Sequence, residues 1–334
     1  MGPSPIVAVA VRGGEGRLAW RTTASTVFAI VLARPELWLI GALSMIARGG
    51  LLLLTAPLVT LPSPVGLGVL LGPEVLGGST AALGELVVGA VAGAAALLLG
   101  GLVLAASADL MAYERFVRDP ESLEVRAGRE PRRLSPRCRL STVFSLVGIQ
   151  AVALVPAIVA AVVLGEWAAV LIRGELLSPS SEVPLLARLA FGAREPIVAL
   201  IMALLVAEIV GSIASRHLLA SRFGLARDRR PVTEARSLRM AVVQALAAPV
   251  LVASRSAGAW LIAGLLVLPV AGALVIAWGE VRRLYLAPVV LEAEVGGARL
   301  LITLAFASLW IAVMLMAGLA SAIRGALATA ASFR

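Results

Sequence analysis

Long apolar blocks constrain the fold of this 334-residue chain more than any other feature of its sequence. Each block is about 20 residues long, which is enough for a helix to cross the hydrocarbon core of a bilayer. Hydrophobic residues make up 60% of the chain and charged residues 15%, whereas a soluble domain is nearer half apolar and a quarter charged. Because backbone polar groups in lipid must be paired internally, the blocks predict an all-α, polytopic integral membrane protein.

Six transmembrane helices are predicted within a single membrane domain at 17–334, which follows a flexible, Gly-rich tail at 1–16. Two half-polar segments, 17–34 and 234–255, precede the first and fifth spans and are typical of helices that lie along the membrane surface. For 17–34, a buried helix docked under the bundle is the alternative. The predicted spans are 37–61, 86–108, 140–164, 196–215, 258–278 and 300–323.

The distribution of arginine predicts the orientation. All 29 basic residues are arginine, and with a cytoplasmic N-terminus 22 of them lie in inside segments, 6 in outside segments and Arg48 in the membrane. This asymmetry predicts that both termini are cytoplasmic. The exclusive use of arginine indicates a GC-rich genome. The expected location is the cell membrane of a prokaryote. The net charge of +9 is explained by these loops, which favours anionic lipids at the cytoplasmic face as partners over nucleic acid.

Arg48 and Glu208 are lone charges near the middle of the first and fourth predicted spans. An arginine at that depth costs about 2.5–3.5 kcal/mol on insertion scales, so it needs a partner or water. Their matching depth predicts an ion pair between the two spans. The pair either fixes the register of the helices or lines a polar cavity or substrate path. A third interpretation is that Arg48 snorkels or flanks a helix break at Gly49–Gly50.

Other polar and small residues in the spans are weaker candidates. Glu85 begins the second span at its outer end, and Gln150 lies in the third span, which we expect to be broken there and at Pro156. Glu85 can belong to a substrate path or simply be hydrated. Gln150 and Pro156 can border the same cavity as Arg48 and Glu208, or they can only form a hydrogen bond and a kink. Small residues spaced about four apart predict a helix-packing face on the second span: Gly89, Gly93 and Gly100.

The stretch WRTTASTVFAIVLARPELWLIGAL, at 20–43, resembles a known family in its order of surface helix, Arg-Pro and Trp-bearing span. The family is the six-span membrane domain fused to some bacterial and archaeal glycerophosphodiester phosphodiesterases, together with its stand-alone relatives of unknown function. The resemblance implies a six-span fold without an established activity. The phosphodiesterase catalytic domain is missing from this sequence, so the resemblance implies no catalytic residue.

Enzyme signatures are missing too: the sequence contains no HExxH, GxSxG or Walker A motif and no Cys/His cluster. We therefore expect no catalytic residue, no metal and no cofactor. The leading functional hypothesis is a membrane scaffold or partner subunit, which would bind another protein or a second copy. The alternative is a transporter or lipid-handling protein with a polar cavity around Arg48 and Glu208.

Overall fold

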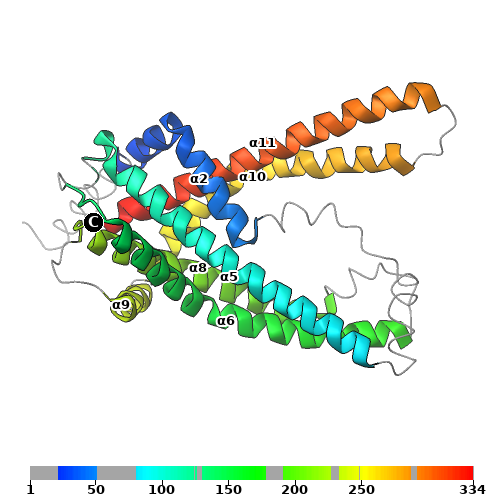
Figure 1. The fold of residues 1–334 in the computed structure, drawn as a ribbon, viewed down its shortest axis with the longest axis horizontal. Coiled ribbons are helices and arrows are strands. Elements are labelled where there is room, and N and C mark those ends of the chain that lie inside the picture. Colours follow the sequence, from blue (N-terminus) through cyan, green and yellow to red (C-terminus); the bar gives the residue numbers. More distant parts are fainter. Residues whose placement is uncertain are drawn as a thin grey trace, which may run out of the picture.

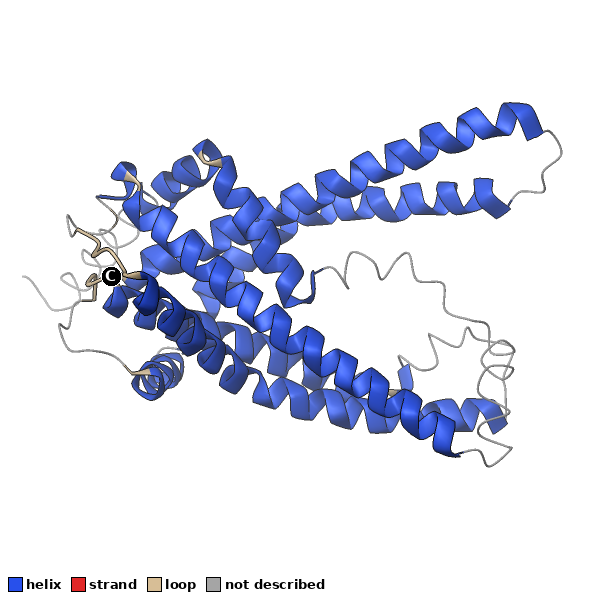
Figure 2. Ribbon diagram, in the orientation of Figure 1, coloured by secondary structure: helices blue, strands red, loops and turns tan. Residues whose placement is uncertain are grey.

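The computed structural model of the chain describes residues 22–50, 80–123, 125, 130–177, 191–226, 233–247, 249–286 and 292–333. Figure 2 shows that these residues form helices and a few short loops, with no strand in the described ranges. Five of the helices are long and apolar enough to cross a membrane, and a bent pair near the N-terminus adds a possible sixth. The all-α prediction is therefore confirmed for the described part of the chain.

The long helices extend well beyond the predicted spans. The longest has 42 residues, or about 60 Å at 1.5 Å per residue, against about 30 Å of hydrocarbon core. The predicted spans were shorter because only their apolar stretches were counted, whereas charged residues at the ends continue the helices. The long helices are α5 (Thr80–Arg118), α6 (Pro136–Leu177), α8 (Arg194–Arg222), α10 (Pro249–Leu286) and α11 (Glu292–Ser332).

The helix Thr22–Ala33 meets α2 (Pro35–Met45) at an angle of 93°. Arg34 lies between them in a non-helical conformation, because the residue before a proline is excluded from helical geometry and Pro35 is suited to start a helix. Val27, Ile30 and Val31 are buried in the main core. This packing favours the alternative of a docked helix, while its position relative to a membrane surface stays a prediction. The second half of the predicted first span lies outside the described residues.

Two predicted details of the helices are wrong. Helix α6 continues through Gln150 and Pro156 without a break, which is possible because a proline removes only one backbone hydrogen bond from a helix. The half-polar segment 234–255 is not one helix. Helix α9 (Glu234–Ala247) ends two residues before α10 begins at Pro249, where the proline suits the first position of a new helix.

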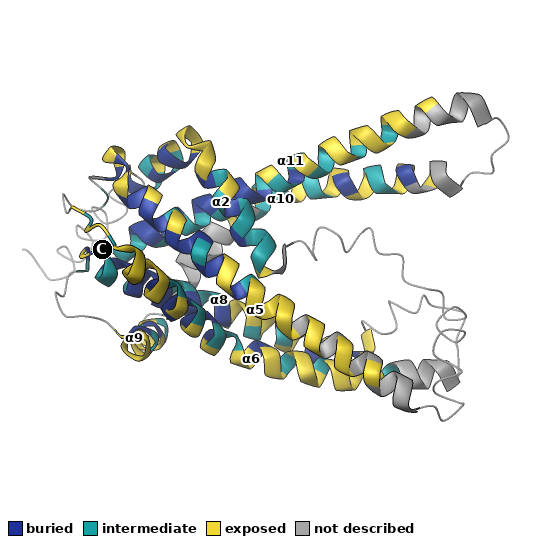
Figure 3. Cartoon of the chain, viewed as in Figure 1, coloured by how far each residue is buried: buried dark blue, intermediate teal, exposed yellow. Residues whose placement is uncertain are grey.

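The long helices form two groups that converge at one end and diverge at the other (Figure 1). We call α5, α6 and α8 the three-helix arm, and α10 and α11 the two-helix arm. Helix α2 packs against both α5 and α11 and thereby joins the arms. Buried residues gather at the converging end, where the C-terminus also lies, and most of the diverging helices are exposed (Figure 3).

Helix α9 lies across the long helices at the converging end (Figure 1). The Ser237 hydroxyl donates a hydrogen bond to the carbonyl oxygen of Ala214, and a His217 ring nitrogen lies 3.0 Å from the Gln244 side-chain oxygen. These two contacts tie α9 to α8. His217 thus helps to hold the crossing helix in place.

Glycines let α2 approach its neighbours closely. A Cβ atom on Gly41 would lie 2.2 Å from the Gly318 carbonyl oxygen, and one on Gly101 would lie 2.5 Å from the Ala47 carbonyl oxygen. By contrast, a Cβ atom on any glycine of the predicted packing stripe would meet nothing within 4 Å among the described residues. The stripe of Gly89, Gly93 and Gly100 therefore makes no helix contact in the described part of the chain.

Candidate functional site

Arg48 lies in a π-helical turn, Ile46–Gly50, that continues α2. Such turns widen the helix by one residue and occur frequently at functional sites. The backbone of this turn sits against α5, because Gly101 has no side chain to hold the Ala47 carbonyl away. The turn thus brings Arg48 against the three-helix arm at the place where the sequence suggested a helix break.

Two acidic residues from different helices bind Arg48. Its Nη2 atom donates a hydrogen bond to Asp109 of α5, and its Nη1 atom lies 3.2 Å from Oε1 of Glu208 on α8. Arg324 of α11 donates from Nη1 to the same Glu208 oxygen at 2.5 Å. Glu208 therefore bridges an arginine that follows α2 and an arginine of the two-helix arm.

Asp109 is the other centre of the cluster. Its Oδ1 atom lies 3.9 Å from the Arg216 guanidinium of α8 and accepts a hydrogen bond from the Ser44 hydroxyl at 3.5 Å. The Gln150 amide of α6 donates to its Oδ2 atom at 3.2 Å. We call the five charged residues the arginine network: Arg48, Asp109, Glu208, Arg216 and Arg324.

The arginine network carries three positive charges against two negative ones. It therefore has an excess of one positive charge, counted over the described residues. Asp109 and Arg216 are buried, whereas the side chains of Arg48, Glu208 and Arg324 are 26%, 27% and 19% exposed. The exposed members are the ones joined through Glu208, so the network has a buried side and an accessible side.

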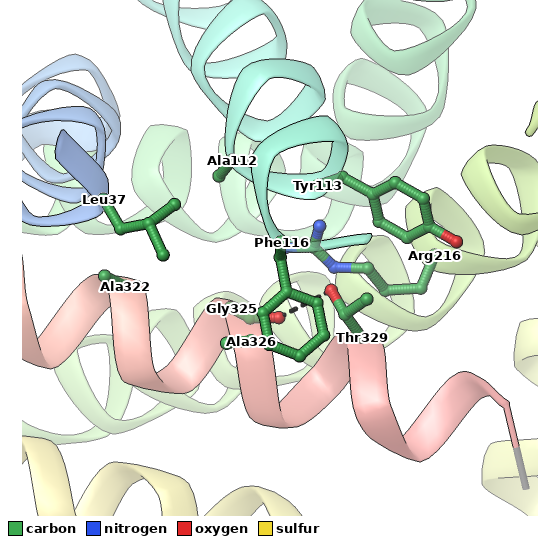
Figure 4. Close-up of a pocket in the computed structure, with 9 residues that line it drawn as sticks. All are labelled: Leu37, Ala112, Tyr113, Phe116, Arg216, Ala322, Gly325, Ala326 and Thr329. Atoms are coloured by element: carbon green, nitrogen blue, oxygen red, sulfur yellow. Dashed lines mark hydrogen bonds between the residues drawn. The ribbon is translucent and has the colours of Figure 1, made fainter. Parts of the chain in front are cut away.

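A small cavity of about 20 Å³ lies beside the buried side of the network, with room for about one water molecule. Figure 4 shows Arg216 reaching from α8 towards α11, with Tyr113 and Phe116 of α5 beside it. A Cβ atom on Gly325 would lie 3.4 Å from Nη2 of Arg216. The guanidinium therefore lies in van der Waals range of the α11 backbone at this position.

The structure brings together three of the candidates that the sequence singled out. The predicted ion pair between Arg48 and Glu208 is present, and Gln150 joins the network through Asp109. Glu85 does not join: it is exposed and precedes Asp109 on the same helix by 24 residues, or roughly 36 Å along its axis. Glu85 therefore lies far along α5 from the network, and a role for it on a substrate path stays a prediction.

Sequence reasoning missed Asp109, Arg216 and Arg324 as members of the site. Each lies at the end of an apolar block, where a charged residue normally marks the membrane boundary. In the structure, however, α5 continues for nine residues after Asp109 and α11 for eight residues after Arg324. No sequence signal separates them from boundary residues, because the turns of α5 after Asp109 include further charges, Glu114 and Arg115.

The chemistry of the network is that of anion binding. Guanidinium groups offer planar pairs of donors that match carboxylates and phosphates. Within the described ranges, no group of three or more His, Cys, Asp or Glu side chains could hold a metal ion. The arrangement can hold helices together through charge pairs, and its accessible side can bind an external anion.

Comparison with known proteins gives no guide to the role of this network. No family model matches the chain. A search of curated proteins and a search of solved structures also found no match. Functional inference therefore depends on the geometry of the site.

An exchange of charge between Arg48 and Glu208 tests the network as a unit. Either single reversal, Arg48→Glu or Glu208→Arg, should lower folded yield, because it places like charges together in a partly buried network. The double exchange should fail to restore the yield. It would set a glutamate beside Asp109 and an arginine beside Arg324. Size-exclusion chromatography and thermal unfolding in detergent measure the result, and full recovery by the double variant would reduce the network to an isolated pair.

Proposed function

We propose that this chain is a transporter or lipid-handling protein that admits an anionic group to the arginine network. The observation that carries the proposal is the partly exposed, net positive network at the junction of the two helix arms. A pair that only fixed the register of two helices would need one arginine and one acid. Here three arginines share two carboxylates, and the accessible side of the network has the surplus charge.

The position of the network supports this role. Its members come from both arms and from the turn after α2, so binding an anion there would act on contacts between the arms. Helix groups that meet at one end and diverge at the other can rock about their junction, as the halves of many transporters do. Ion pairs at such a junction would differ between the two positions of the arms.

Reconstituted liposomes test the proposal. We expect the wild-type protein to accelerate either the exchange of a fluorescent acidic lipid between leaflets or the uptake of inorganic phosphate, at least several-fold over empty liposomes. Arg48→Gln should abolish the acceleration, because it removes the arginine that links both acids. Arg283→Gln is the matched control: it makes the same change at an exposed arginine that pairs, within the described residues, with Glu280 three positions before it. Folded wild-type protein that moves neither probe would contradict the proposal.

A scaffold or partner subunit is the second candidate, and the two-helix arm favours it. Many of its large apolar side chains are exposed, Leu265, Leu268, Leu301 and Ile311 among them. Such a surface can face lipid, a second copy or another membrane protein. Crosslinking in the native membrane that captured this arm against one defined partner, together with inactive liposomes, would support the scaffold.

Three further points accompany the proposal. The placement in a prokaryotic cell membrane, with both termini in the cytoplasm, is supported by the arginine count of the loops. Binding of anionic lipids at the cytoplasmic face is supported by the arginines Arg236 and Arg239 on α9. Membership of the glycerophosphodiester-phosphodiesterase membrane-domain group is supported by the sequence resemblance at 20–43.

A further inference from the structure

We propose that the anionic group is the headgroup of an acidic phospholipid with a single negative charge. It would be held by Arg48 and Arg324 in competition with Glu208. This inference rests on the proposed function, since it names the ligand of the same network. It adds two specific claims: that the ligand is a lipid, and that a residue of the chain is its internal competitor.

The geometry around Glu208 resembles a bound anion. One carboxylate oxygen is 3.2 Å from Nη1 of Arg48 and 2.5 Å from Nη1 of Arg324. One guanidinium group comes from the turn after α2 and the other from α11 of the two-helix arm, and this carboxylate joins them. Phosphodiester oxygens accept the same kind of charge-assisted hydrogen bond from arginine. The position that Glu208 occupies is therefore one that a phosphodiester could share or take over.

The charge balance favours a ligand with one negative charge. Counted over its five members, the network has one surplus positive charge. A phosphodiester in a lipid such as phosphatidylglycerol carries one negative charge, and it would neutralise the network where it shares the two arginines with Glu208. A zwitterionic lipid brings no net charge, so it would leave the surplus in place.

The surroundings of Glu208 favour a lipid over a soluble anion. Ile201, Leu204 and Leu205 precede Glu208 by seven, four and three residues on α8, so they lie on the same side of the helix. All three side chains are exposed. An acyl chain lying along them would leave its headgroup beside Glu208, whereas a soluble anion would gain nothing from this apolar strip.

Native mass spectrometry of the purified, delipidated protein tests the inference. The probes are phosphatidylglycerol, phosphatidylcholine and inorganic phosphate. We expect at least tenfold more retention of phosphatidylglycerol than of phosphatidylcholine. Glu208→Gln should increase that retention by several-fold, because it removes the competing carboxylate. Arg324→Gln should abolish the preference, while Arg283→Gln, at an exposed position on α10, should leave it unchanged.

Each result decides the inference. Equal retention of the two lipids, or weaker phosphatidylglycerol binding in Glu208→Gln, would overturn it. Displacement of phosphatidylglycerol by millimolar inorganic phosphate would overturn the lipid assignment and leave an anion site in place. If Arg324→Gln fails to fold, Glu208→Gln still decides. Binding is measured in detergent, so inactive liposomes with intact lipid preference would contradict the proposed function and not this inference.

Discussion

Asp109→Asn is expected to destabilise the protein more than any other conservative change in the arginine network. The Asp109 carboxylate is buried, and it binds Arg48 and Arg216 while it accepts hydrogen bonds from Gln150 and Ser44. Asparagine keeps the size of the side chain but removes its charge. Arg216, itself buried, would lose its closest acidic partner. Breaking a buried ion pair by removing one partner costs roughly 3–5 kcal/mol.

Thermal unfolding in detergent and the yield of monodisperse protein measure this effect. Glu280→Gln is the matched control, because it removes a carboxylate whose partner, Arg283, is 79% exposed. A pair at such a site contributes at most about 1 kcal/mol. If Asp109→Asn unfolds at the same temperature as Glu280→Gln, then water or other neighbouring groups stabilise Arg48 and Arg216 without the Asp109 carboxylate. The network would then contribute nothing to holding the arms together.

The sequence predicted the all-helical membrane class and one contact of the site, for the same physical reason. Charges are so costly in lipid that their placement in an apolar block is informative. Arg48 and Glu208 stood alone in such blocks, so their pairing could be inferred from depth. Asp109, Arg216 and Arg324 stood at the ends of apolar blocks. A charged side chain there can reach water at little cost in free energy, so its position does not indicate a partner. Their helices continue past them, and only the structure shows that they turn inward.

Helix packing was predicted less well, because a small residue indicates only that a close approach is possible. Gly89, Gly93 and Gly100 had the regular spacing of a packing face, yet they meet no described helix. Gly41 and Gly318 belong to no regularly spaced glycine stripe. Even so, α2 and α11 approach each other at these two residues more closely than helices do at any other described glycine. The rotation of each helix about its own axis decides which faces meet. A single amino-acid sequence does not determine that rotation for helices that are far apart in the chain.

Gly318→Leu is expected to separate α2 from α11 and to disable the arginine network together with the fold. A Cβ atom on Gly318 would lie 2.5 Å from the Trp38 carbonyl oxygen and 2.8 Å from the Ala42 Cβ. Neither neighbour is the flexible end of a side chain, so the helices themselves must move. Overpacking of this kind typically costs 1–3 kcal/mol and occasionally more. Because Arg48 follows α2 directly, the same movement would pull it from Glu208 and Asp109.

Gly93→Leu is the matched control, since it makes the same chemical change on α5 where a Cβ atom meets nothing within 4 Å of the described residues. Leucine is also favoured over glycine in a helix by roughly 1 kcal/mol, so Gly93→Leu should be neutral or stabilising. Thermal unfolding and lipid retention should both fall in Gly318→Leu and stay unchanged in the control. If Gly93→Leu were equally damaging, the outer part of α5 must pack against something beyond the described residues. The predicted glycine stripe would then be a real interface, and the scaffold hypothesis would gain the surface that it needs.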